Sequence, residues 1–271
     1  LSSWMIKKRI IFTFYYCDGF FVQSRNFDLQ KVGNIDWIKK NYDLEKISNF
    51  IDEVAIINLS SKNSNEDFLK NLKELAKSFL IPIIAGGRIK NFEDVKKYFY
   101  NGCDKIILNS NLRTNINLIK KISKSYGSQS IVASIDYKKN GKENFIFTNN
   151  GKKKISEKPN KYLSEILKLD IGEVLLRSID KDGSGEGLDF NFLKHIPKKN
   201  NKNIILAGGS GNVNHIEQGL KNKSVNAVCT GNLFNFINDE LKNTRENLLK
   251  KNFKLASWNS SEIKKFKNKF K

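Results

Sequence analysis

A duplicated segment constrains this chain more than any other feature of its sequence. One copy reads IIAGGRIKN from Ile83 to Asn91, and the other reads IILAGGSGN from Ile204 to Asn212. Each copy predicts a buried strand that ends in a Gly-Gly turn, followed by an amphipathic helix and a second apolar strand. A lone Gly-Gly turn is most often only a tight turn, whereas a repeated unit of this length indicates one structural motif used twice.

The spacing within the two copies also agrees. Gly87 precedes Asn109 by 22 residues, and Gly209 precedes Asn232 by 23 residues. A glycine at the carboxyl end of a strand lets backbone N–H groups approach an anion closely, and the next helix N-terminus adds a favourable dipole. The duplication therefore predicts two phosphate-binding sites in one chain.

Short apolar runs alternate with helical segments along the whole chain. The predicted strands are Arg9 to Tyr16, Glu53 to Leu59, Ile81 to Ala85, Lys105 to Asn109, Ser130 to Asp136, Glu173 to Ser178, Asn203 to Ala207 and Ala227 to Thr230. The predicted helices are Glu66 to Phe79, Phe92 to Tyr100, Asn115 to Tyr126, Asn160 to Leu169, Asn214 to Asn222 and Asp239 to Lys251. Eight buried strands that alternate with helices predict a single-domain (β/α)₈ barrel built from two similar half-barrels, with its active site at the carboxyl ends of the strands. A doubly wound open sheet is the alternative.

The charge and composition limit the functional classes. A formal charge of +20 suits nucleic-acid binding, but the lysines are spread over nearly every predicted helix, so we expect no nucleic-acid partner. Only the segment from Lys264 to Lys271 concentrates basic residues, as solvated chain ends often do. The sequence has no apolar run of membrane-spanning length and no signal-peptide pattern, so we expect a soluble, cytoplasmic protein.

The cysteines and histidines predict neither disulfides nor metal binding. Cys17, Cys103 and Cys229 are odd in number and far apart, and His195 and His215 are isolated. No CxxC pair or Cys/His ligand spacing is present. We therefore expect neither a metal nor another cofactor.

Several short motifs recur in the order and at the distances of a known family. They are Lys8-Arg9-Ile10-Ile11, Asp18-Gly19, Asp104-Lys105, Gly127-Ser128-Gln129, Ile135-Asp136, Gly172-Glu173 and Ser178-Ile179-Asp180-Lys181-Asp182-Gly183. Together they resemble the HisF family, the cyclase subunit of imidazole glycerol phosphate synthase. The resemblance implies a HisF-like barrel over residues 5–255, with residues 1–4 as an upstream extension before Met5 and residues 256–271 as a basic tail.

In that family a HisH-like glutaminase docks on the amino-terminal face of the barrel and releases ammonia, which passes through the barrel to a substrate with two phosphates. Arg9, Glu53, Lys105 and Glu173 each begin a predicted strand and match the family's salt-bridged ammonia gate. Taken singly, each is more simply a solvated residue at the bottom of the barrel. As a set of alternating sign, they can neutralise one another at a constriction.

The family's phosphate-binding positions are largely retained. The resemblance assigns Gly86, Gly87 and Asn109 to the first anion site, and Asp182, Gly183, Ser184, Gly208, Gly209, Gly231 and Asn232 to the second. Asp182-Gly183 can also be read as a simple turn. Arg88 replaces the third glycine of the first loop, where it either binds a phosphate or acidic sugar or only fills the site.

The catalytic positions depart from the family. Its acid/base pair comprises one aspartate on the first strand and one on the fifth, because ring closure needs proton transfer at two positions. Asp136 retains the second of these, with a strand-end capping role as the alternative, but Tyr15 stands in place of the first. A phenol, with an ordinary pKa of about 10, is a poor substitute for a carboxylate near neutral pH. Asn58 and Arg177 also replace an aspartate and a small hydroxyl residue.

The departures favour a paralogue. The segment from Phe20 to Asn34 resembles the WbuZ-like branch of the family, which is associated with glycosyl amidation and lacks the same aspartate. That resemblance implies a glutaminase partner, a separate N-acetyl sugar amidotransferase and a phosphorylated or nucleotide-linked substrate, for acetamidino modification of a surface-polysaccharide or flagellar sugar. A true cyclase of histidine biosynthesis and a basic binding or scaffold protein stay open as alternatives.

Overall fold

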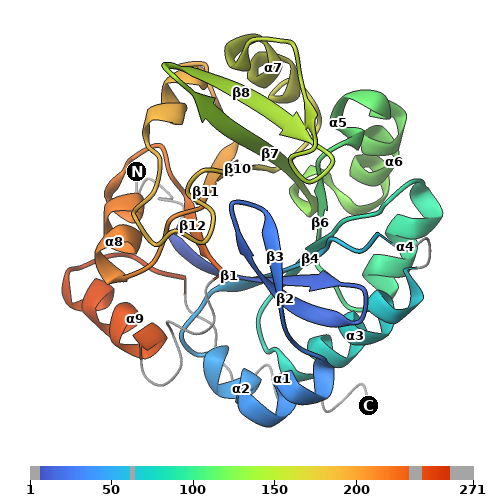
Figure 1. Ribbon diagram of the computed structural model, residues 1–271, viewed down its shortest axis with the longest axis vertical. Coiled ribbons are helices and arrows are strands. Elements are labelled where there is room, and N and C mark those ends of the chain that lie inside the picture. The colour runs from blue at the N-terminus through green and yellow to red at the C-terminus, as the bar shows by residue number, and fades with distance from the viewer. Residues whose placement is uncertain (1–6, 62–64, 232–239, 257–271) are drawn as a thin grey trace, which may run out of the picture.

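Eight parallel strands close into a barrel in the computed structural model, which describes residues 7–61, 65–231 and 240–256. In barrel order the strands are β1 (Arg9–Cys17), β4 (Glu53–Asn58), β5 (Ile83–Gly86), β6 (Lys105–Leu108), β7 (Ile131–Asn140), β10 (Glu173–Ser178), β11 (Asn203–Ala207) and β12 (Ala227–Thr230). β12 pairs with β1 and β7 pairs with β10, so the parallel sheet has no free edge. The predicted (β/α)₈ barrel is confirmed (Figure 1).

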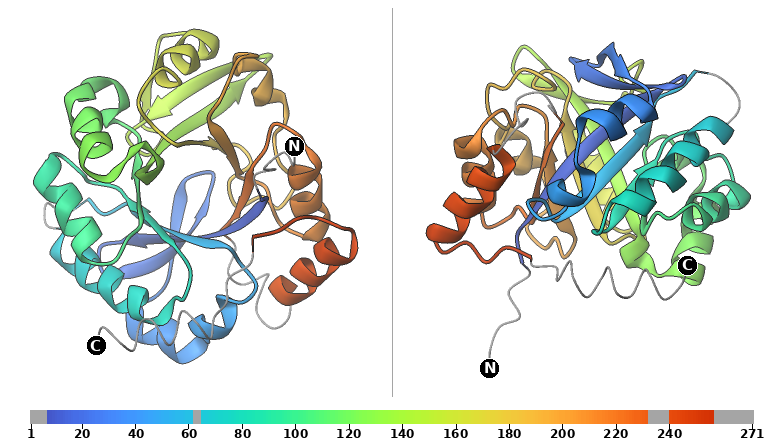
Figure 2. Two further views of the ribbon diagram at one scale, coloured as in Figure 1. Left: turned by 180° about the vertical axis from the view of Figure 1, so that it is seen from behind. Right: turned by 90° about the horizontal axis from the view of Figure 1, so that it is seen from below.

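Helices form the outer layer around the barrel (Figures 1 and 2). They are α1 (Ile35–Asn41), α2 (Leu44–Ile47), α3 (Glu66–Ser78), α4 (Phe92–Tyr100), α5 (Asn111–Thr114), α6 (Ile116–Tyr126), α7 (Pro159–Ile166), α8 (Val213–Lys221) and α9 (Glu240–Lys250), with short 3₁₀ turns η1 (Ser128–Ser130) and η2 (Asn191–His195). The asparagines that end the two duplicated segments have the same role: Asn91 caps α4 and Asn212 caps α8 through their side-chain oxygens. No helix among the described residues is long and apolar enough to cross a membrane.

Two antiparallel hairpins at the carboxyl end of the barrel were not predicted. β2 (Phe20–Arg25) and β3 (Asp28–Gly33) continue from β1, and β8 (Glu143–Thr148) and β9 (Lys153–Lys154) continue from β7. β7 therefore extends to Asn140 rather than stopping at Asp136, because its last residues pair with β8. Figure 1 shows the β2–β3 hairpin in front of the centre of the barrel.

Apolar side chains pack on both faces of the barrel wall. The larger cluster joins the outward-facing strand residues to the inner faces of the helices, and α3 contributes Phe68, Leu72 and Leu75 to it. A second cluster fills the interior of the barrel with residues from different strands, among them Ile11, Ala55, Ile84, Ile107, Val132, Leu175 and Ile205. The strands are buried on both faces, which explains their nearly continuous apolar sequences.

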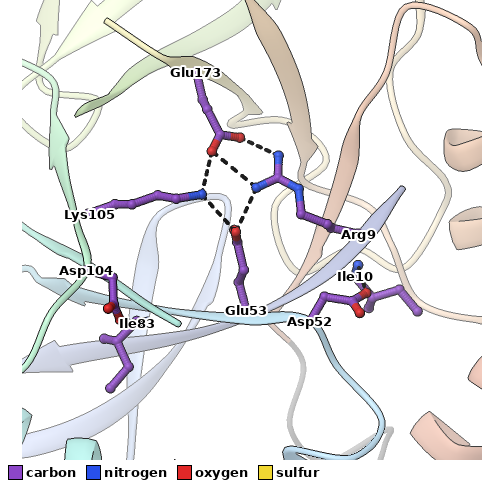
Figure 3. Close-up of polar contacts among 8 residues, drawn as sticks. All are labelled: Arg9, Ile10, Asp52, Glu53, Ile83, Asp104, Lys105 and Glu173. Atoms are coloured by element: carbon purple, nitrogen blue, oxygen red, sulfur yellow. Dashed lines mark hydrogen bonds and ion pairs between the residues drawn. The ribbon is translucent and has the colours of Figure 1, made fainter. Parts of the chain in front are cut away.

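A two-bond bracket recurs at the amino ends of three strand pairs. In each bracket, the residue before one strand makes two hydrogen bonds to a single residue on the neighbouring strand. Its backbone N–H donates to the carbonyl of that residue, and its side-chain oxygen accepts the backbone N–H of the same residue. The three brackets join Asp52 to Ile10 (2.9 and 2.8 Å), Asp104 to Ile83 (2.7 and 2.8 Å) and Asn226 to Ile204 (2.7 and 2.8 Å). Figure 3 labels the residues of the first two, Asp52 beside Ile10 and Asp104 beside Ile83.

Candidate functional site

The Gly-Gly turns lie at the carboxyl end of the barrel, and their backbone needs glycine. Gly87 has φ +97°, and a Cβ added to it would lie 2.0 Å from the Asn58 carbonyl oxygen. Gly209 has φ +93°, and a Cβ added to it would lie 2.1 Å from the Gly187 carbonyl oxygen. Gly86 has a different reason, since a Cβ there would lie 2.4 Å from the Ile107 carbonyl oxygen across the β5–β6 pair. Both turns therefore present main chain rather than side chains at the barrel mouth.

The larger cavity at this end, about 380 Å³, lies beside the second Gly-Gly turn. It contains most of the residues predicted for the second anion site: Asp182, Gly183, Gly208, Gly209 and Gly231. Ser184 donates its hydroxyl to the Lys181 carbonyl at 3.0 Å within the preceding turn. Asn232 lies outside the described residues. The hairpin adds polar side chains to the wall, including Gln23, Arg25 and Gln30.

The smaller cavity, about 220 Å³, lies beside the first Gly-Gly turn. Gly87 and Asn109, two of the three residues predicted for the first anion site, line it together with Arg88, Asp136 and Arg177, whereas Gly86 does not. Arg88 adopts a left-handed conformation with φ +54°, and its guanidinium donates to the Ser60 carbonyl at 2.8 Å. Its Nε is buried with no hydrogen-bond partner among the described residues, so the arginine is only partly satisfied within this cavity.

A buried ion pair occupies the centre of the barrel mouth. Asp136 on β7 and Arg177 on β10 are register partners, and Arg177 donates from Nε and Nη2 to the two carboxylate oxygens at 2.9 and 3.0 Å. Asp136 also accepts from the side chains of Asn109 and Ser134, each at 3.3 Å. Only 1% of Asp136 is exposed, so its carboxylate is fully surrounded by protein donors.

Tyr15 on β1 completes this central group. Its hydroxyl lies 3.5 Å from Arg177 Nη1, and burial raises the pKa of its phenol further above the ordinary value, against the opposing charge of Arg177. Burial by itself would lower the pKa of Arg177, but the Asp136 carboxylate outweighs it and raises that pKa. At neutral pH the centre therefore holds a guanidinium, a paired carboxylate and a neutral phenol.

The tip of the β2–β3 hairpin covers this group. The Phe27 ring centre lies 4.3 Å from the Arg177 guanidinium carbon, within the range of a cation–π contact. Phe27 has φ +69°, a conformation that costs a bulky residue ~1–3 kcal/mol. Asp182 holds the tip in place, because it accepts the Ser24 hydroxyl and the Phe27 N–H (3.2 Å) on its carboxylate and the Asn26 N–H (2.9 Å) on its carbonyl.

Four charged side chains meet at the opposite, amino-terminal end of the barrel (Figure 3). Arg9 donates to Glu53 at 2.8 Å and to both oxygens of Glu173, while Lys105 donates to Glu53 at 2.8 Å and to Glu173 at 2.5 Å. Two positive and two negative charges thus form a ring without net charge. Burial would raise the pKa of Glu173, but Arg9 and Lys105 outweigh it and lower that pKa below its ordinary value.

The apolar interior cluster separates this charged ring from the barrel mouth. Cys229 on β12 belongs to it, and burial raises the pKa of its thiol to about 12. Among the described residues, no group of three or more His, Cys, Asp or Glu side chains is arranged to hold a metal ion.

Comparison with known proteins places the chain in a family. The family model described as "Histidine biosynthesis protein" matches residues 31–239. A protein of Parasynechococcus marenigrum described as "Putative imidazole glycerol phosphate synthase subunit hisF2" is 42% identical over 89% of this chain and 90% of its own length. The chain belongs to the HisF family. Proteins described as "Imidazole glycerol phosphate synthase subunit HisF" are similar at 31% identity in Pelodictyon phaeoclathratiforme and 32% in Clostridium botulinum, over 90% and 92% of this chain and 96% and 98% of theirs.

Within this HisF-family barrel, the predicted residues gather in three places: two cavities at the carboxyl end and one charged ring at the amino end. Sequence reasoning missed the use of Arg177 and Phe27. Arg177 was recognised as a departure from the HisF pattern, but its pairing with Asp136 depends on the β7–β10 register. Phe27 lay inside the segment from Phe20 to Asn34, where the only local signal was a bulky residue between Asn26 and Asp28 at a hairpin tip.

Proposed function

We propose that this HisF-family chain is the ammonia-using subunit of a glutamine-dependent complex and that it does not close an imidazole ring. The observation that carries this proposal is the bidentate pair between Arg177 and Asp136, at 2.9 and 3.0 Å. A general acid or base must be able to exchange a proton with the substrate near neutral pH. Asp136 is instead held by a permanent cation, and Tyr15 has a pKa raised above that of an ordinary phenol.

The charged ring supports the use of ammonia from a partner. Arg9, Glu53, Lys105 and Glu173 close the amino end of the barrel with opposite charges that neutralise one another. Behind the ring lies an apolar interior, through which a neutral molecule passes at lower cost than an ion. A HisH-like glutaminase docked on this face would deliver ammonia directly into the barrel, and the four residues would act as its gate.

The hairpin supports a sugar as the acceptor of the nitrogen. The segment that resembles the glycosyl-amidation branch forms β2 and β3, and it contributes Gln23 and Gln30 to the wall of the larger cavity. Amide side chains offer both donors and acceptors, which suits the hydroxyl groups of a sugar. We therefore propose that a phosphorylated or nucleotide-linked sugar derivative binds here, with Asp182, Gly183, Ser184, Gly208, Gly209, Gly231 and Asn232 around its phosphate, and that an N-acetyl sugar amidotransferase acts in the same pathway.

A second candidate is a true cyclase of histidine biosynthesis. It is favoured by relatives described as imidazole glycerol phosphate synthase subunit HisF, which match more than 90% of their own length. In that case the first phosphate would bind at Gly86, Gly87 and Asn109. Asp136 would have to act with an acid/base partner other than a carboxylate on β1.

Ammonia-dependent turnover of the phosphoribosyl-formimino substrate of histidine biosynthesis separates the two. We expect no turnover by the unmodified chain, and measurable turnover by the double variant Tyr15→Asp/Arg177→Ser, which restores a carboxylate and frees Asp136. Tyr100→Asp is the matched control, because Tyr100 is 82% exposed on α4 and lines neither cavity at the barrel mouth. Turnover by the unmodified protein would overturn the proposal.

The partner is tested separately. A purified HisH-like glutaminase should hydrolyse glutamine faster when this chain is added, and Lys105→Met should reduce that stimulation if the ring lies at the interface. Absence of any stimulation by a panel of such glutaminases, together with no complex on gel filtration, would refute the ammonia-using role.

A further inference from the structure

The carboxyl end of the barrel is divided into two separate cavities. No described residue lines both of them: Tyr15, Asp182 and the second Gly-Gly turn belong to the larger, while Asp136, Arg177 and the first Gly-Gly turn belong to the smaller. A two-phosphate substrate whose ends lie in the two anion sites must pass through the space between them. The residues in that space therefore decide which substrates fit.

Arg177 fills this space and is held there from several sides. Its guanidinium is fixed by both oxygens of Asp136, lies 4.3 Å from the centre of the Phe27 ring and lies 5.7 Å from that of Tyr15. Only 5% of Arg177 and 7% of Tyr15 is exposed. A guanidinium with a bidentate carboxylate and an aromatic face is strongly constrained, because moving it breaks every one of these contacts.

Phe27 is held over the arginine from above. Asp182 accepts hydrogen bonds from Ser24, Asn26 and Phe27, which ties the hairpin tip to the loop after β10. On the other side, the turn between β8 and β9 comes so close that a Cβ on Gly151 would lie 2.9 Å from the Phe27 ring. The strained backbone of Phe27 is thus maintained between two fixed segments, with its ring directed at Arg177.

We propose that Arg177, Phe27 and Tyr15 form a partition that restricts this chain to ligands with a single phosphate, bound in the larger cavity, and excludes a substrate that spans both cavities. The inference rests on the proposed function, since it names the substrate class of the same site. Small-molecule cavities commonly have volumes of about 300–1,000 Å³, so the larger cavity (about 380 Å³) suits a compact sugar phosphate and the smaller (about 220 Å³) only a fragment. Arg88 already occupies part of the smaller cavity.

Calorimetric titration of the full chain with two probes tests the partition. The probes are ribose 5-phosphate, with one phosphate, and the phosphoribosyl-formimino compound named above, with two. The unmodified chain should bind the two with affinities within roughly threefold of each other, because the second phosphate finds no site it can reach. An unmodified chain that binds the two-phosphate compound about tenfold or more tightly than ribose 5-phosphate would overturn the inference.

Variants of the partition supply the second half of the test. Phe27→Gly removes the ring and also relieves the strained backbone, and Arg177→Ser removes the guanidinium. Each should raise affinity for the two-phosphate compound by about tenfold or more while changing that for ribose 5-phosphate little, since a second charge-assisted anion contact becomes available. Phe20→Ala is the control, because Phe20 lies on the same hairpin, is 37% exposed and contacts Lys31 rather than Arg177.

The outcomes distinguish this inference from the proposed function. Arg177→Ser leaves Asp136 without its partner and can fail to fold, so the double variant Arg177→Ser/Asp136→Asn, which removes both charges together, completes the test beside Phe27→Gly. If neither Phe27→Gly nor Arg177→Ser/Asp136→Asn changes the ratio of the two affinities, the partition is refuted. Tight binding of the two-phosphate compound without turnover would refute the partition and leave the non-cyclising role intact, whereas turnover would refute the role.

Discussion

The pair between Arg177 and Asp136 should dominate the stability of the barrel mouth. Both partners are buried, with 5% and 1% of their surface exposed, and they share two hydrogen bonds of 2.9 and 3.0 Å. Replacing Arg177 by Met keeps a long apolar stem but leaves the Asp136 carboxylate without its cation. Removing one partner of a buried pair costs ~3–5 kcal/mol, a large share of the ~5–15 kcal/mol by which folded proteins are stable.

The double variant Arg177→Met/Asp136→Asn separates the cost of an unpaired charge from the value of the pair. Replacing both charges by groups of similar volume often changes stability little, so the free energy of unfolding of the double variant should lie within ~1–2 kcal/mol of that of the unmodified chain. The coupling between the two positions should then be at least ~2 kcal/mol, measured from urea unfolding followed by far-UV circular dichroism.

Arg113 provides a matched control for these measurements. It also contacts two carboxylates, those of Glu157 and Glu165, but its side chain is 41% exposed. Arg113→Met should therefore change the free energy of unfolding by less than ~1 kcal/mol. If Arg177→Met lowered the free energy of unfolding no more than Arg113→Met does, the pair at the barrel mouth would contribute no more stability than an exposed pair and would not immobilise Asp136.

Three further predictions concern other parts of the barrel. Gly87→Ala should lower the free energy of unfolding by ~3 kcal/mol or more, because its Cβ would lie 2.0 Å from the Asn58 carbonyl oxygen. Gly19 also has a positive φ but has open space around it, so Gly19→Ala should cost only ~1–2 kcal/mol in the same urea assay. Equal costs for the two variants would contradict this prediction. Glu173→Gln should unfold with a lower free energy than the unmodified chain at neutral pH. Because the folded pKa of Glu173 is lowered, this difference in the free energy of unfolding should be present above the ordinary value of 4.5 and should shrink as the pH falls through the lowered pKa. A difference that does not depend on pH would refute the prediction. Cys229 should resist iodoacetamide at mildly alkaline pH in the folded chain and react in urea, because burial raises its pKa to about 12; mass spectrometry of the labelled peptides checks this, and native labelling at the rate seen in urea would count against it.

The strands and the general position of the site were predictable because their signals are local. β10, β11 and β12 have the bounds that their apolar sequences predict, and α4 likewise. The first Gly-Gly turn and the strand-end residues Asn109 and Asp136 line one cavity because parallel strands in a barrel end on the same side. These conclusions need only periodicity, turn chemistry and the rule of closure.

The hairpins and the central ion pair depend on contacts that the sequence does not display. β3 is polar and exposed along most of its length, so it lacks the alternating pattern of a half-buried strand and forms because it pairs with β2. Arg177 faces Asp136 because the β7–β10 register places them opposite each other, and a shift of one residue would turn the arginine to the other face. Register in a parallel pair is set by the whole barrel, which is why the partition was not predicted.

The brackets at the amino ends of the strands have a consequence for how the barrel can change. In a closed barrel the stagger of all neighbouring strands must add up to one fixed shear, so a slip in one pair has to be compensated in another. Asp52, Asp104 and Asn226 fix the alignment of three pairs with two hydrogen bonds each, far from the cavities. The shape of the barrel is thus specified at the amino ends of the strands, so substitutions at the carboxyl ends, including those at Tyr15 and Arg177, should leave the alignment of these three pairs intact.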